Sequence, residues 1–145
     1  MAELYCSLDK GGDGIQLNKS TDYAIRILLY LGRQGEPCST VQISQEMKIP
    51  ERETSFLLKK MTSLHILQSS RGKYGGYVLN VHLENISMYD VISWTTKEMK
   101  INECLKHPHA CSRGNTEMCK VRQCFSDLQI LVENRLQSIK LNEFI

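Results

Sequence analysis

The chain has 145 residues, 41% of them hydrophobic, and a formal net charge of +2. This length fits one domain, or one small domain with an appendage, and the hydrophobic content supports a compact core. The weak charge alone gives no case for nucleic-acid binding, and the absence of any run of about 18 apolar residues excludes a membrane span.

The first residues show no periodic pattern and end in Gly-Gly-Asp-Gly, so we expect residues 1–14 to be a flexible extension, native or left from expression. They lack the charged and then apolar pattern of a secretory signal peptide. We therefore expect a cytoplasmic protein. In that compartment thiols stay reduced, so cysteines serve metal binding or thiol chemistry more often than structural disulfides.

The segment Lys19–Gly32 predicts an amphipathic helix, because apolar residues recur at the i, i+4 and i+8 spacing of one helix face. Ser20 or Thr21 is the expected cap at its start, and Gly32 its expected end. Asp22 lies in the first turn, where a negative charge interacts favourably with the helix dipole.

Two further helical patterns follow, joined by a short turn. Ser39 and Gln42 form a capping box for a helix that reaches about Met47, and Pro50 suits the first turn of the next helix. The second of these helices has one apolar and one polar face, which predicts a helix-turn-helix. Its expected apolar positions are Leu57, Leu58, Met61 and Leu64.

A glycine-rich turn between two short strand patterns comes next. Residues 65–70 and 77–79 have strand character, and the turn between them carries cations and a tyrosine among its glycines. Glycines let a backbone approach a phosphate closely, so this hairpin predicts a wing. The expected fold is therefore mostly α with a small β-hairpin wing, a winged helix-turn-helix over residues 15–82.

Two helices are expected after the wing. Ser87 and Asp90 form a capping box for a connecting helix within residues 83–103. A long helix from about Lys120 to Ser138 lies within residues 120–145, and its apolar stripe packs either on its own domain or on a second copy of the chain. The stripe consists of Val121, Phe125, Leu128, Val132, Leu136 and Ile139.

Four of the six cysteines lie between Cys104 and Cys124. Zinc sites favour cysteine pairs two to four residues apart, and no C-x-x-C occurs here, so a zinc site is disfavoured. The wide spacing suits a loop around an iron–sulfur cluster, which thiolates hold, while metal-free thiol chemistry is the alternative. The expected sensor loop spans residues 104–119.

These features resemble the IscR/NsrR family of bacterial winged-helix repressors over residues 15 to 144. The resemblance rests on Thr21-Asp22-Tyr23-Ala24, on the Arg71–Tyr77 wing and on the cysteine loop after it. It implies a homodimer that binds palindromic double-stranded DNA under the control of a 2Fe-2S or 4Fe-4S cluster, which senses redox state, nitric oxide or iron–sulfur status. The alternative is a cluster-free regulator that senses thiol oxidation or a partner protein. No paired acid–base constellation points to an enzyme.

The resemblance also implies a set of cluster ligands. Cys104, Cys111 and Cys119 match the three cysteines of the family, because Leu128 stands where the family has a leucine only when counted from Cys119. One family branch adds a histidine at the position of Arg122, which cannot ligate iron. Another adds an aspartate from the partner subunit, matched here by Asp22. The remaining candidates for the fourth ligand are His107, His109 and Cys124.

DNA contacts are expected from the second helix of the helix-turn-helix and from the wing. The family has an aromatic residue and a leucine where this chain has Glu53 and Thr54, so the docking of that helix is open. The expected groove contacts are Arg52, Thr54, Ser55 and Lys59. The expected wing contacts are Arg71, Lys73 and Tyr74, with Arg71 as the base contact.

Overall fold

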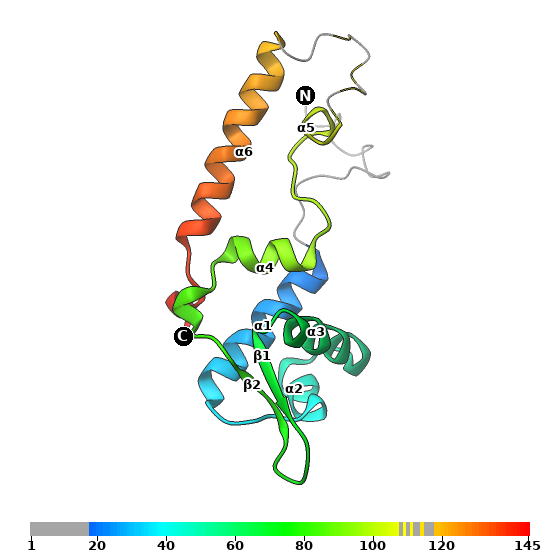
Figure 1. The fold of residues 1–145 in the computed structure, drawn as a ribbon, viewed down its shortest axis with the longest axis vertical. Coiled ribbons are helices and arrows are strands. Elements are labelled where there is room, and N and C mark those ends of the chain that lie inside the picture. Colours follow the sequence, from blue (N-terminus) through cyan, green and yellow to red (C-terminus); the bar gives the residue numbers. More distant parts are fainter. Residues whose placement is uncertain (1–17, 108, 110, 112–113, 115–117) are drawn as a thin grey trace, which may run out of the picture.

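The computed structural model describes residues 18–107, 109, 111, 114 and 118–145; the extension expected at residues 1–14 lies outside these. The architecture is mostly α-helical with one two-stranded antiparallel hairpin, which confirms the predicted fold class (Figure 1). In chain order the elements are α1 (Lys19–Gln34), α2 (Thr40–Met47), α3 (Glu51–Ser63), β1 (Leu67–Ser70), β2 (Gly76–Leu79), η1 (Leu83–Asn85), α4 (Met88–Thr95), α5 (Glu103–Lys106), α6 (Lys120–Ser138) and η3 (Leu141–Phe144).

Helix α1 is capped differently from the sequence prediction. Asn18, and not Ser20 or Thr21, is the N-cap, since its side-chain oxygen accepts a hydrogen bond of 2.8 Å from the Thr21 amide. The helix continues past Gly32 and ends at Gly35, whose φ of 67° is the left-handed conformation that glycine adopts without strain.

Helices α2 and α3 form the predicted helix-turn-helix. Ser39 caps α2 by accepting a hydrogen bond from the Gln42 amide, as expected from the capping box, and Lys48 turns the chain in a left-handed conformation. Helix α3 buries Leu57, Leu58 and Met61 as predicted. Leu64 was expected on the same face, but it terminates the helix and stays 42% exposed.

The wing is the hairpin of β1 and β2, paired in register from Leu67 with Leu79 to Ser70 with Gly76. A backbone bridge between Cys38 and Tyr77, with hydrogen bonds of 3.0 and 2.8 Å, ties β2 to the loop that precedes α2. A side chain at Gly76 would put its Cβ 2.6 Å from the carbonyl oxygen of Cys38, so this close approach requires glycine.

Beyond the wing, α4 lies between the helix-turn-helix and the long helix α6, which extends away from that domain (Figure 1). The bounds of α6 are those predicted from the sequence. After α6 the chain returns to the helix-turn-helix domain, where Lys140 forms a backbone bridge with Ser87 and Leu141 is fully buried in the core. No helix in the described part of the chain is long and apolar enough to cross a membrane.

The core lies among α1, α3, α4, the base of the wing and η3, whereas α6 contributes little to it. Four of the six residues of the predicted stripe are partly buried, namely Phe125, Val132, Leu136 and Ile139. Other apolar side chains of α6 face solvent. They are Val121 (60% exposed), Leu128 (45%), Ile130 (53%) and Leu131 (65%). A single chain therefore leaves an apolar surface on this helix.

Candidate nucleic-acid interface and cysteine loop

Helix α3 carries two stripes on opposite faces, each with the i, i+3, i+4, i+7 spacing of one helix side. The inward stripe is buried and consists of Thr54, Leu57, Leu58 and Met61. The outward stripe is exposed or half-buried and consists of Arg52, Ser55, Phe56 and Lys59. Three of the four predicted groove residues thus share one accessible face.

Thr54 does not share this face. Its side chain is 0% exposed, and its hydroxyl donates to the Pro50 carbonyl at 3.2 Å. The prediction that Thr54 contacts the groove is therefore wrong, because the helix turns this position into the core. Phe56, which the sequence interpretation left out, takes its place on the outward stripe. Its i+4 spacing from Arg52 was the signal that could have found it.

Glu53 does not break helix α3. Glu51 and Glu53 both lie in the first turn of α3, where a negative charge interacts favourably with the partial positive charge of the helix N-terminus. Thr54 stands where the family resemblance leads one to expect a leucine, and its hydroxyl donates a hydrogen bond to the Pro50 carbonyl. The helix accommodates both departures.

The tip of the wing is accessible. Tyr74 is 85% exposed, and the ammonium of Lys73 lies 5.7 Å from the centroid of its ring. Arg71 is also exposed, and Gly72 has a φ of 110° that favours glycine. All three predicted wing residues are thus free to meet a partner, and their DNA contacts stay predictions.

His65, just before the hairpin, is exposed and has a φ of 59°, which is the left-handed conformation. Glycine adopts this conformation without strain, and histidine tolerates it. The chain therefore turns at this position between α3 and β1.

Cys38 has a structural role in the backbone bridge to Tyr77 that anchors the wing. Its side chain is 1% exposed, and burial raises the pKa of its thiol, an effect that the Glu36 carboxylate strengthens. A thiol held protonated in this way is a poor nucleophile and metal ligand.

The predicted ligand cysteines lie along the connection between α5 and α6. Cys104 belongs to α5 and Cys119 is the N-cap of α6; both are half-buried, as is Cys111 between them. Cys124 is exposed on α6. Thiolates suit iron–sulfur clusters, so the donor chemistry fits. Within the described residues, however, no three His, Cys, Asp or Glu side chains gather into a metal site.

The candidates for a fourth ligand are all accessible. Asp22 is 53% exposed on α1 and forms an ion pair of 2.6 Å with Arg26 one turn later. His107 and His109 are exposed, and Nε2 of His107 lies 3.6 Å from Glu103. Among the residues described in one chain, none of these candidates joins the cysteines in a three-ligand group.

A polar clamp fixes the segment that leads into the cysteine loop. Gln129 of α6 is 4% exposed, accepts from the Ile101 amide at 2.9 Å and donates to the Met99 carbonyl at 2.7 Å. It also donates to the Glu133 carboxylate at 2.7 Å. Arg122 adds a bond of 3.3 Å to the Cys104 carbonyl. The entry to the loop is therefore held against the long helix.

A second polar contact joins the same segment to α1. The hydroxyls of Thr21 and Thr95 share a hydrogen bond of 2.6 Å, and the Asn18 amide donates to the Thr95 carbonyl at 3.2 Å. Thr95 ends α4 and Asp22 follows Thr21 directly. The end of α4 thus connects the first turn of α1 with the path to the loop.

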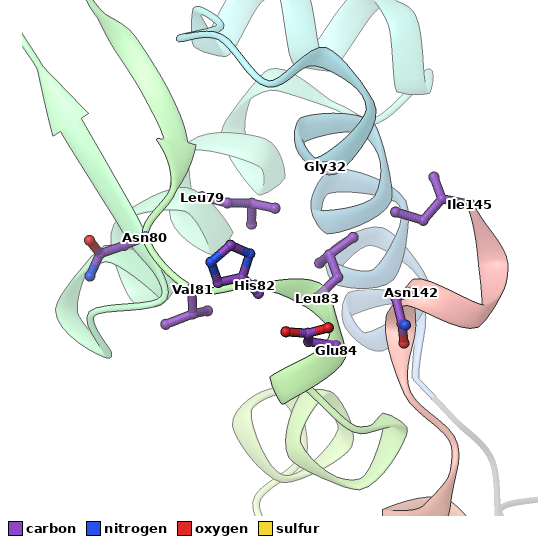
Figure 2. Close-up of a pocket in the computed structure, with 9 residues that line it drawn as sticks. All are labelled: Gly32, Leu79, Asn80, Val81, His82, Leu83, Glu84, Asn142 and Ile145. Atoms are coloured by element: carbon purple, nitrogen blue, oxygen red, sulfur yellow. The ribbon is translucent and has the colours of Figure 1, made fainter.

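A shallow hollow of about 360 Å³ lies where the base of the wing, α1 and the C-terminal η3 meet (Figure 2). Leu79 and Leu83 approach α1 there at Gly32, where an added Cβ would stand 2.5 Å from a methyl of Leu83. Its titratable side chains are His82 and Glu84, beside the amides of Asn80 and Asn142. The hollow is thus the place where these three elements pack against one another.

Comparison with solved structures finds a similar fold in proteins of distant sequence. The structure described as CymR (YrzC), the global cysteine regulator of B. subtilis, superposes with a TM-score of 0.73 over 89% of this chain and 95% of that one, at 21% identity. T. potens IscR gives a TM-score of 0.69 over 92% and 88% of the two chains, at 18% identity.

Two relatives in sequence are named HTH-type transcriptional regulator NsrR. That of Bacillus subtilis is 28% identical over 92 residues, 62% of this chain and 63% of the relative, which is less than two thirds of its length. That of Shouchella clausii is 24% identical over 137 residues, 89% and 91% of the two chains. The relatives are named as regulators and not as enzymes. The family model Rrf2, described as iron-dependent transcriptional regulator, matches residues 17–145, so the chain belongs to the Rrf2 family of winged-helix transcriptional regulators.

Proposed function

We propose that the protein is a homodimeric repressor whose affinity for DNA depends on an iron–sulfur cluster held by Cys104, Cys111 and Cys119. The observation that carries this proposal is the set of half-buried thiols on one loop, tied at its entry to α6. A bound cluster would supply an iron centre sensitive to redox state, to nitric oxide or to iron–sulfur status. The residues of the chain would hold the cysteine loop and transmit the state of the cluster to the DNA-binding helices.

A second copy of the chain covers the apolar surface of α6. Val121, Leu128 and Leu131 are each about half or more exposed, and burial of such side chains stabilises an interface by roughly 1.5–3 kcal/mol for each full burial. In a twofold dimer, two copies of α3 read two half-sites of a palindrome about one helical turn apart.

Asp22 of the second copy supplies the fourth ligand. It is half-exposed, and its ion pair with Arg26 is a surface pair of adjacent turns, which contributes little stability. The carboxylate is therefore free to leave Arg26. Carboxylate oxygen is a weaker partner for iron–sulfur chemistry than thiolate, so Asp22 would be the most easily displaced of the four ligands.

The alternative is a cluster-free regulator of the same fold that senses thiol oxidation or a partner protein. It is favoured by the fact that, among the residues that the structure describes, no three candidate ligands come together in one chain. Of the cysteines that the structure describes, the exposed Cys124 is the most accessible for such chemistry.

Anaerobic purification distinguishes the two. The proposed function predicts a coloured protein with iron and acid-labile sulfide, lost on changing Cys104, Cys111 or Cys119 to serine and retained in the control Cys124→Ser. Asp22→Ala is expected to keep iron but to change the visible spectrum. A colourless, iron-free protein that binds DNA and responds to oxidants supports the alternative.

A further inference from the structure

Phe56 is an aromatic side chain left in water on the outward face of α3. It is 58% exposed, although the inward face of the same helix is already filled by Leu57 and Leu58. Arg52 lies one turn before it and Lys59 one turn after it, on the same face. The ring therefore forms an apolar spot between two positive charges and takes no part in the core.

The surroundings of Phe56 indicate what it contacts. An apolar spot flanked by cations suits a partner that offers an apolar group between negative charges. Glu53, three residues before Phe56, adjoins the ring on one side, whereas Glu51 is turned about 140° away from it by the helical rotation per residue. In the DNA major groove the C5-methyl of thymine is such an apolar group, set between two rows of phosphates. Phenylalanine has no donor or acceptor, so it distinguishes bases only by apolar contact.

We propose that Phe56 is a specificity-determining residue that recognises a thymine in each half-site through its C5-methyl group. The inference rests on the proposed function of α3 as the DNA-reading helix. In this arrangement Arg52 and Lys59 hold the helix on the phosphates or on neighbouring base edges, and Phe56 selects one base pair between them.

Removal of single methyl groups from DNA tests the inference. Duplexes are first selected by the purified protein from a random pool, and each thymine is then replaced by deoxyuridine, which differs only in lacking the methyl. The wild type is expected to lose about fourfold in affinity at one position of each half-site, the effect of one buried methyl group. Phe56→Ala is expected to bind the thymine and deoxyuridine duplexes equally.

Two variants serve as controls. Phe56→Leu keeps an apolar side chain and is expected to retain the preference for thymine. Lys59→Ala is expected to weaken binding to both duplexes alike and to leave the methyl preference intact. Because Phe56 is mostly exposed, Phe56→Ala is expected to unfold within a few degrees of the wild type.

The outcomes separate the inference from the function on which it rests. If the protein selects no duplex from the pool, the proposed DNA-binding function fails and this inference with it. If a duplex is selected but the wild type tolerates every deoxyuridine, Phe56 does not read a methyl, while the regulatory function stands. A Phe56→Ala variant that still prefers thymine also overturns the inference.

Discussion

Replacement of Gln129 by leucine removes the clamp between α6 and the entry to the cysteine loop. Gln129 is almost fully buried and makes hydrogen bonds to the Ile101 amide, the Met99 carbonyl and the Glu133 carboxylate. The change leaves two backbone groups without partners, each worth about 1–3 kcal/mol. Burial of the leucine side chain offsets about 1.5 kcal/mol. We therefore expect a loss of about 2–3 kcal/mol in the free energy of unfolding.

Urea unfolding at fixed protein concentration measures this loss, and the control is Gln137→Leu, an exposed glutamine on the same helix. A second readout follows the loop itself: alkylation of Cys104, detected by mass spectrometry, is expected to speed up in Gln129→Leu and not in the control. Wild-type stability together with an unchanged alkylation rate would refute the idea that Gln129 holds the loop entry.

Three further predictions concern the wing and its anchor. Gly76→Ala places a Cβ against the Cys38 backbone and is expected to lower both thermal stability and DNA affinity; unchanged melting would show that the wing relaxes freely. Lys73→Ala is expected to weaken binding across DNA sequences and to reduce the salt dependence of log Kd by about one phosphate contact, measured by titration at several salt concentrations; sequence-dependent effects would contradict this. The raised pKa of Cys38 means that its thiol ionises less readily in the folded state than in the unfolded state. The free energy of unfolding is therefore unaffected by this thiol below its pKa in the unfolded chain, about 8.5, and falls as pH rises above that value. Urea unfolding at several alkaline pH values should show a smaller fall in Cys38→Ala.

Local sequence signals predicted most of the fold. The Ser39 cap and the capping box at Ser87 mark the starts of α2 and α4, and the apolar period predicts the bounds of α6, because these features act within one or two helical turns. The cap of α1 was assigned to Ser20 or Thr21 because adjacent polar residues cap equally well in isolation. Asn18 prevails because its amide also reaches Thr95, far away in the sequence.

Only part of the candidate site could be predicted from the sequence. The cysteine positions and the cationic wing tip are visible in the sequence, but residue type outweighs helical phase in the prediction, which therefore misplaces Thr54 and omits Phe56. The phase puts Thr54 with Leu57 and Leu58, and it puts Phe56 with Arg52. The clamp of Gln129 depends on the path of the chain between α4 and α6, which no local pattern encodes.

In the proposed function, DNA affinity depends on a cluster held by the cysteine loop. The most direct measurement is the Kd for a selected duplex, determined by fluorescence anisotropy under anaerobic conditions for the iron-loaded protein and for the same preparation after iron removal. Circular dichroism checks that the helices persist. We expect two affinities that differ by about tenfold or more, a coupling of about 1.4 kcal/mol. Equal affinities, or a protein that never contains iron, would contradict it.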